Sequence, residues 1–286
     1  MNSYLLYPDK DGTGEAVYPS FHDMYKDLNL NIVLKTMARD DVFMMEQIRN
    51  VMMVPLCRAS EVEYRYEIIR DFQQNPELAG ELYSLGVKGY KLARQYKEEM
   101  EQDRRKATIK TSAIIASLNF IEDSMGLIRT LRELLQRKEI HLNSKGMTGL
   151  VQRLSHYPLE DFLDFHKNFL FYTTGGEGIF SIRISGGLKL SESRLKKCQN
   201  YHYHALKGTS FTFMKLYYKL AKKDSILIEK EQLEKDIGVF VESHMLQITA
   251  AYQPLINDCV KFLFQFARET SFYQGVYTMQ RRTQEL

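Results

Sequence analysis

Residues 54–72 read VPLCRASEVEYRYEIIRDF and crowd acids and arginines together as an active site does. Pro55 disfavours helix in the residue that precedes it. Ser60 followed by Glu63 fits a capping box, in which each side chain satisfies a backbone N–H of the other residue. We therefore expect a helix that begins at about Ser60.

Spacing predicts which side of this helix is buried. Val62, Tyr66 and Ile69 recur at intervals of four and three residues, which indicates one apolar stripe. Glu61 and Arg65 lie four apart and predict a helix-supporting pair on another face, with the acids directed to water or to each other. Nothing here positions a nucleophile or a metal, so the stretch is interpreted as scaffold.

Helical patterns dominate on both sides of this stretch. Asn75 and Pro76 supply an N-cap and a first-turn proline, which predicts a second helix that ends near Gly86. Residues 111–142 contain no proline and predict a helix on the order of 45 Å long at about 1.5 Å per residue. Its apolar seam consists of Ile114, Leu118, Ile121, Met125, Ile128, Leu131 and Leu135.

Two more helices are expected towards the C-terminus. The first covers about 225–249, and the second begins at Pro254. The second places Leu255, Cys259, Phe262 and Phe266 on one face. Methionines precede the first capped helix and are interpreted as core, with an adaptable binding surface as the alternative; they are Met37, Met44, Met45, Met52 and Met53.

The spacing of apolar residues changes once from the helical period to alternation, between about 177 and 222. GIFSIRISGGLKL alternates apolar and polar residues and breaks at Gly186-Gly187, which is typical of a β-hairpin. SFTFMKLYY, from Ser210, predicts a third strand. The expected fold class is therefore mainly α, with an elongated helical core, long lever helices and a small antiparallel β insertion as a clamp-like tip.

Charge, cysteine spacing and hydropathy limit the class of protein and the compartment that we expect. The 286 residues carry a net charge of +3, too small to indicate nucleic-acid binding by itself. Cys57, Cys198 and Cys259 are widely spaced and lack CxxC spacing, which argues against a disulfide framework or structural zinc. The N-terminus lacks the basic and apolar regions of a signal peptide, and the apolar segments are far shorter than a membrane-spanning helix requires. We expect a soluble cytoplasmic protein without membrane contact.

Several motifs resemble landmarks of the MutS mismatch-repair family, in proteins that lack the mismatch-reading domain. They are DLNLN at 27–31, Pro55-Leu56 with ExEYRYEIIRDF, SKGMTGL at 144–150, FSIRISGG, and FARETSFY at 266–273. Their order and spacing carry the resemblance over about 25–280. It implies a helical core, a lever of long helices, a clamp that touches the DNA backbone without reading sequence, and a C-terminal ATPase.

The resemblance suggests a division of the chain. The expected parts are an N-terminal arm at 1–24, a helical core at 25–110, outgoing lever helices at 111–176, a clamp-like β insertion at 177–222, and returning lever helices at 223–286 that lead to a missing ATPase domain. Phe120-Ile121-Glu122 is similar to the family's Phe-x-Glu wedge, but it lies within an apolar helix pattern and is interpreted as structural.

The sequence departs from the family in one respect that decides activity. It contains no GxxxxGK[ST], so no loop is present to hold nucleotide phosphates. We expect no enzyme activity and no cofactor in this chain, with ATP and Mg²⁺ only in a full-length relative. Either the chain is a piece of a longer protein or it has lost its motor. The resemblance allows a homodimer through the missing domain; a monomer is expected for this chain.

Charge supplies the strongest candidate site. Residues 186–223 hold nine basic residues against the single acid Glu192. Lysines neutralise phosphates without fixed geometry. Together with the DNA contact that the resemblance implies, this makes duplex DNA the expected partner. The alternative is a solvated face around an aromatic mini-core. The candidate DNA-backbone residues are Lys189, Arg194, Lys196, Lys197, Lys207, Lys215, Lys219, Lys222 and Lys223, and the interleaved aromatics are Tyr201, Tyr203, Phe211, Phe213, Tyr217 and Tyr218.

Other chemistry-bearing residues favour plainer explanations. His202, His204 and Cys198 supply too few ligands for zinc, because no carboxylate or second cysteine is in register. Ser193 to Lys196 matches SxxK without its partner motifs. A polar helix face explains Asp161, Asp164 and His166.

The predicted function is therefore the core, lever and clamp portion of a MutS-like mismatch-repair ATPase. It would contact duplex DNA and couple that contact to an ATPase domain on the same natural chain. The alternative is a protein-interaction module without DNA contact, whose partner would need aromatic anchors. An independent enzyme is the least supported hypothesis, because the sequence holds no catalytic constellation.

Overall fold

The computed structural model describes residues 2–8, 20–54, 56, 58–105, 111–156, 178–185, 189–197 and 230–284 of the chain. The chain divides into two compact units. The first unit comprises residues 1–159 and 249–286, and the second comprises 160–248. Each unit is described by itself.

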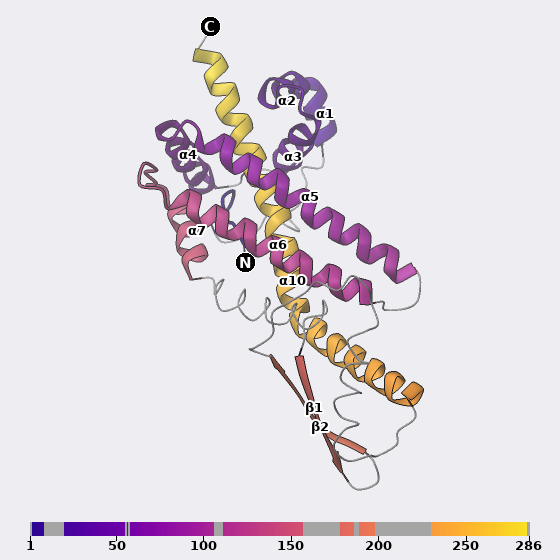
Figure 1. The fold of residues 1–286 in the computed structure, drawn as a ribbon. Coiled ribbons are helices and arrows are strands. Elements are labelled where there is room, and N and C mark those ends of the chain that lie inside the picture. Colours follow the sequence, from indigo (N-terminus) through magenta and orange to yellow (C-terminus); the bar gives the residue numbers. More distant parts are fainter. Residues whose placement is uncertain are drawn as a thin grey trace. The chain divides into compact units, whose positions relative to one another are not determined.

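The described residues contain eight helices and two strands (Figure 1). The helices are α1 (Phe21–Asp27), α2 (Leu30–Ala38), α3 (Val42–Met52), α4 (Ala59–Gln74), α5 (Leu78–Arg105), α6 (Thr111–Leu135), α7 (Lys145–Ser155) and α10 (Lys230–Gln284), and the strands are β1 (Gly178–Ser185) and β2 (Lys189–Lys197). None of the described helices has the length and apolar character that crossing a membrane requires.

The C-terminal part of α10 is the central element of the first unit. Phe262, Phe266 and Tyr273 on this helix are at most 2 % exposed. Tyr273 contacts Phe72 of α4, with their ring centroids 5.5 Å apart. The predicted apolar face of this segment is thereby confirmed. The predicted break at Pro254 is wrong, because α10 continues through it as one helix.

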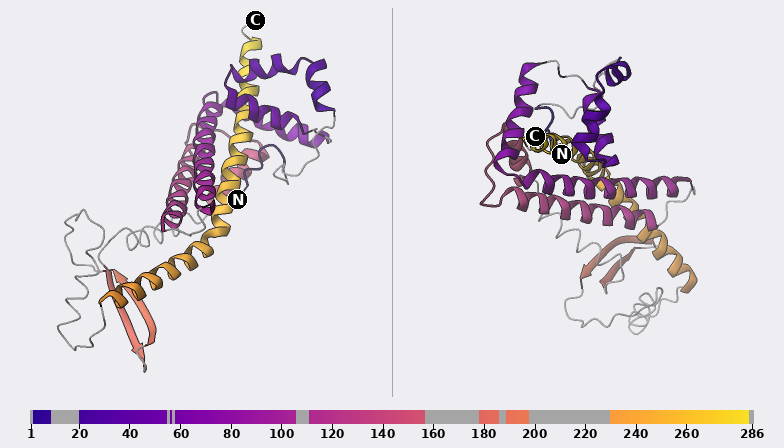
Figure 2. Two further views of the ribbon diagram at one scale, coloured as in Figure 1. Left: turned by 90° about the vertical axis from the view of Figure 1, so that its right-hand side faces the viewer. Right: turned by 90° about the horizontal axis from the view of Figure 1, so that it is seen from above.

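Helices α5 and α6 lie side by side in both views of Figure 2 and pack along their lengths. Tyr96 of α5 stacks on Phe120 of α6, with centroids 4.4 Å apart and planes 17° apart. Phe120 is 2 % exposed, which confirms its interpretation as structural. The predicted seam of α6 is buried from Leu118 to Leu135, although the helix ends at Leu135, short of the predicted end at residue 142.

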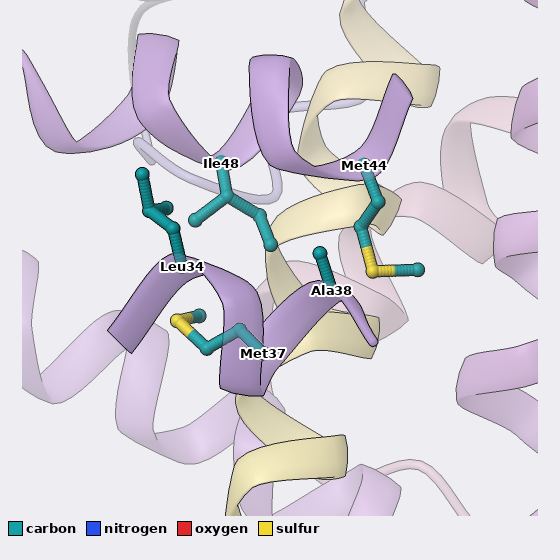
Figure 3. Packing of buried hydrophobic residues seen from close by; sticks show 5 residues of the cluster. All are labelled: Leu34, Met37, Ala38, Met44 and Ile48. Atoms are coloured by element: carbon teal, nitrogen blue, oxygen red, sulfur yellow. The ribbon is translucent and has the colours of Figure 1, made fainter. Parts of the chain in front are cut away.

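Two of the five methionines predicted as core are buried between α2 and α3, and Met45 and Met52 are partly buried against the same cluster. Met37 and Met44 are buried there with Leu34, Ala38 and Ile48 (Figure 3). Methionine suits this position because its unbranched thioether adapts to irregular gaps. The N-terminus of α3 is capped by Asp41, whose carboxylate accepts a hydrogen bond from the Met44 N–H at 3.0 Å.

The buried face of α4 differs from the predicted one. Val62 and Tyr66 are 52 % and 50 % exposed, whereas Glu61 and Arg65 are buried. The helix begins at Ala59 and its N-cap, Arg58, makes no side-chain cap bond, so the predicted capping box is wrong. Arg65 faces inward because it donates to the Leu6 carbonyl, and Glu61 pairs with Arg58 at 3.0 Å.

Gly86 lies inside α5, so the predicted helix end at this residue is wrong. The glycine serves close packing against α10. A Cβ at position 86 would overlap Thr270 Oγ1 and would lie 3.1 Å from Ala267 Cα. The absence of a side chain therefore lets two helix backbones approach each other.

Substitution of this glycine gives a first prediction. Gly86→Ala is expected to lower the free energy of unfolding by about 1–3 kcal/mol, because overpacked helices must move apart. Gly126→Ala in α6 is the matched control, since a Cβ there meets nothing within 4 Å, and alanine favours helix by about 0.5–1 kcal/mol. Urea unfolding measures both; equal effects would contradict the close approach.

The predicted β insertion requires correction. The described part of the first unit contains no strand, and the β structure described in the second unit is one hairpin, in which β1 and β2 pair antiparallel with a bulge at Arg183/Ile184. The third strand expected from Ser210 lies outside the described residues. The class is mainly α, and the β structure of the described residues is limited to this two-stranded hairpin. The clamp-like β insertion predicted for 177–222 is not seen in that part of the chain.

Candidate functional site

The first unit binds the N-terminal segment of its own chain in a buried polar site. Residues 3–7 of the segment enter the core, where Leu5 and Leu6 are at most 1 % exposed. This segment lies outside the helices, so its buried main-chain groups need partners from elsewhere. Side chains of α4, α7 and α10 supply them. We call this arrangement the polar junction.

Glu269 of α10 accepts the hydrogen bonds of the N-terminal segment. Its Oε2 accepts from the Leu5 N–H at 3.1 Å and from the Ser3 hydroxyl. Its Oε1 accepts from the Leu6 N–H at 3.3 Å and from Gln265 Nε2 at 3.1 Å. The carboxyl group thereby satisfies two consecutive backbone N–H groups.

The carbonyls of the segment accept from four other side chains. The donors are Arg153 Nη2 to Ser3 O at 2.6 Å, Tyr64 Oη to Tyr4 O at 2.5 Å, Tyr273 Oη to Leu5 O at 2.6 Å and Arg65 Nε to Leu6 O at 3.1 Å. Most of these contacts recognise main chain, so the junction holds the bent N-terminal segment largely through its backbone.

Both arginines of the junction also stack on tyrosines of the segment. The guanidinium of Arg65 lies 4.9 Å from the ring centre of Tyr7, and that of Arg153 lies 5.1 Å from Tyr4. Such contacts stabilise by about 0.5–2 kcal/mol, more where water is excluded. The segment is therefore fixed through its side chains as well as its backbone.

Burial shifts the proton affinities in the junction. It raises the pKa of Glu269, although the hydrogen bonds from Ser3, Gln265 and the backbone oppose this change. Burial also raises the pKa of Tyr64 to about 12. It lowers the pKa of the Arg153 guanidinium, against the attraction of Tyr64 and Glu269. Desolvation by burial is the largest cause of each of these three shifts in pKa.

A second group of buried hydrogen bonds connects α4 to the N-terminus of α7. The buried Asp71 carboxylate accepts from the Asn143 N–H at 2.9 Å and the Ser144 N–H at 3.0 Å. Asn75, predicted as a helix N-cap, ends α4 and donates to the His141 carbonyl at 2.8 Å. Asp71, at the end of residues 54–72, therefore orders the loop that precedes α7.

The structure places part of the predicted DNA-contacting set on one strand. Lys189, Arg194, Lys196 and Lys197 belong to β2, where Arg194 pairs with Ser181 of β1. Lys207, Lys215, Lys219, Lys222 and Lys223 lie outside the described residues, as do the interleaved aromatics.

The residues weighed for metal binding or catalysis also lie outside the described part. They are Cys198, His202, His204, Asp161, Asp164 and His166. Among the residues that the structure describes, no group of three His, Cys, Asp or Glu side chains is placed to hold a metal ion.

The sequence predictions missed the polar junction. Residues 1–24 were expected as an arm, and the inward role of Arg65 and Glu269 was not foreseen. One signal was available: Glu61, Arg65, Ile68 and Phe72 recur at spacings of four and three, as the predicted stripe of Val62, Tyr66 and Ile69 does. The partner of this face is more than fifty residues away in sequence, and no local pattern identifies it.

Comparison with known proteins gives one positive finding. A family model described as the MutS2 N-terminal domain matches residues 58–286. The match includes α4 to α7, β1, β2 and α10, and therefore Arg65, Arg153 and Glu269. The N-terminal segment held by the junction precedes it. No curated protein and no solved structure matches the chain.

Proposed function

Because the chain belongs to the MutS2 N-terminal domain family, we propose that it is the part of a MutS-like protein that holds duplex DNA by its phosphates without reading sequence. The observation that carries the proposal is the basic run at 186–223, with nine cations and one acid in a chain of net charge +3. Released counterions supply the affinity of such a run for DNA.

The proposal assigns α10 the coupling role. This helix begins at Lys230, shortly after the basic run, and ends at Gln284. Its C-terminal part is tied into the first unit by Glu269 and Tyr273. A packed helix carries a displacement at one end to its other contacts. In our proposal the receiver is an ATPase domain of the full-length protein, which holds ATP and Mg²⁺, and the process served is DNA mismatch repair.

A second candidate is a protein-interaction module in which the same region binds an acidic protein. The aromatic residues between Tyr201 and Tyr218 favour it, because aromatic anchors dominate protein interfaces. Alanine scanning separates the two candidates. DNA binding responds mainly to the lysines, and protein binding responds mainly to the aromatics.

The proposed function is tested by fluorescence anisotropy of a labelled duplex over a salt series. We expect log K to fall with log salt at a slope of about −0.9 per phosphate contact. The test variant carries glutamate in place of Lys196, Lys197, Lys215 and Lys219. It is expected to weaken binding at low salt by about 100-fold or more, because each lost phosphate contact lowers affinity and each new acid repels.

A matched variant controls for net charge. It carries glutamate in place of Lys26, Lys35, Lys88 and Lys91, which are exposed in the first unit, and it changes the total charge by the same amount. We expect this variant to retain most of the binding. Equal loss in both variants would mean that DNA senses only overall charge, and no binding by the parent chain would refute direct contact.

A further inference from the structure

Helix α4 exposes its more apolar face and buries its more polar one. Val62 and Tyr66 are 52 % and 50 % exposed, and Ile69 on the same stripe is partly exposed. The buried face carries Glu61 and Arg65. A surface helix of a globular protein usually turns its apolar stripe towards the core. The reversed arrangement on α4 indicates an apolar stripe whose partner lies outside the single chain.

The exposed stripe has the spacing of a seam between two packed helices. It consists of Val62, Tyr66, Ile69 and Gln73, which follow one another at intervals of four, three and four residues. The a and d positions of a heptad repeat have this spacing. When two copies of such a helix pack antiparallel, each a residue faces a d residue of the other copy. Tyr66 then faces Ile69 of the second copy, and Val62 faces its Gln73.

Two charged residues beside the seam complement each other in the same antiparallel arrangement. Glu63 and Arg70 lie seven residues apart, and each directly follows a d residue of the seam. When Tyr66 is aligned with Ile69 of the second copy, Glu63 of each copy faces Arg70 of the other. The arrangement therefore contains two identical ion pairs. A face that matches itself in this way fits a two-fold contact between identical chains.

Both charged groups are available for this contact. Glu63 is exposed and makes no hydrogen bond or ion pair within the part of the chain that the structure describes. Arg70 is also exposed, and its guanidinium carbon lies 4.7 Å from the ring centre of Tyr66. Such stacking uses the face of the planar guanidinium, whereas its N–H groups lie in the plane. They can therefore donate to a carboxylate while the stacking persists.

We infer that the exposed face of α4 is a contact between two copies of this chain, packed antiparallel about a two-fold axis. The contact differs from one through an ATPase domain, which the family resemblance allows, and it does not depend on the proposed function. Two helices of 16 residues bury less than the roughly 1,200 Å² of a standard stable interface. We therefore expect a weak dimer, with a Kd on the order of 10–100 µM.

Sedimentation velocity of the full chain, from about 1 to about 500 µM, tests the inference. We expect the parent chain to sediment as a monomer at the lowest concentration and mainly as a dimer at the highest. Glu63→Arg alone and Arg70→Glu alone each place like charges across the contact. Each should weaken self-association by about tenfold or more. A parent chain that stays monomeric, or variants that associate as the parent does, would overturn the inference.

A mixture of the two variants separates charge pairing from altered folding. In a dimer of one Glu63→Arg chain and one Arg70→Glu chain, the introduced arginine faces the introduced glutamate, and the native Glu63 faces the native Arg70. Both ion pairs return, so we expect the mixture to associate about as tightly as the parent chain. Association as weak as that of either variant alone would overturn the proposed register.

An exposed ion pair on α5 supplies the matched control. Arg94 and Glu98 pair at 2.8 Å with side chains that are 64 % and 57 % exposed. Arg94→Glu alone and Glu98→Arg alone make the same changes of charge as the α4 variants, and we expect both to leave self-association unchanged. Equal weakening by the α4 and α5 variants would show that only overall charge matters and would overturn the assignment to α4.

Discussion

Deletion of residues 1–7 is expected to lower the free energy of unfolding by at least about 3 kcal/mol, because it leaves the buried carboxyl group of Glu269 without three of its hydrogen-bond partners. In the intact chain Glu269 is fully buried and accepts from Ser3, Leu5 and Leu6. The deletion also exposes the apolar surface that Leu5 and Leu6 cover. Urea unfolding followed by circular dichroism measures the loss.

Rescue in trans distinguishes specific binding from general destabilisation. A peptide of residues 1–8, MNSYLLYP, should restore stability to the deleted chain, by about 2.7 kcal/mol at a concentration of 100 Kd. A peptide with aspartate in place of Leu6 should not, because it places a charge at a position that is 1 % exposed. Unchanged stability on deletion would show that the segment is dispensable.

Substitution of Glu269 by leucine has the second large effect. It leaves the Leu5 and Leu6 N–H groups buried without an acceptor, at a cost of about 1–3 kcal/mol each, so we expect a loss of about 2–6 kcal/mol. Glu269→Gln keeps one oxygen acceptor and should lose less. Glu81→Gln breaks an exposed pair with Arg137 and is expected to cost about 0–1 kcal/mol. Chemical unfolding of the three variants gives the order; a leucine variant as stable as Glu81→Gln would contradict the junction.

The pH dependence of this residue has a defined sign. Burial raises the folded-state pKa of Glu269 above its ordinary value of 4.5, so the native state holds a proton that the unfolded chain releases. The resulting stabilisation is fully present below pH 4.5 and is lost as pH rises through the folded-state pKa. Glu269→Gln lacks this dependence. The stability of the parent chain relative to the glutamine variant should therefore fall with rising pH above 4.5; a relative rise would contradict the raised pKa.

Local periodicity predicted the elements whose cores are built from near neighbours. The α6 seam was predicted because its apolar residues recur without a competing polar stripe. Met37 and Met44 pack in a core formed by α2 and α3, which are adjacent in sequence. On α4 two sets of residues recur with the helical period. The sequence predicts burial of the more apolar set, with Val62 and Tyr66, whereas the structure buries the set with Glu61 and Arg65.

Long-range partners explain what local rules missed. Arg65 faces inward because the carbonyl of Leu6 needs a donor, and Gly86 continues a helix because Ala267 and Thr270 approach it. These contacting residues are distant in sequence, so the sequence of a single helix does not predict them. Pro254 was expected to begin a helix, since proline suits a first turn, but α10 passes through it. The predicted DNA-contacting residues of 207–223 lie outside the described residues, and their role rests on charge and family membership.

Hydrogen–deuterium exchange of the full chain, with and without a saturating short duplex, tests most directly whether the basic run is the DNA-contacting region. We expect slower exchange of backbone amides in peptides that cover 189–223, because bound phosphates exclude water there, and unchanged exchange along α5 and α6. Protection confined to α5 and α6, or no protection at saturating duplex, would contradict the account.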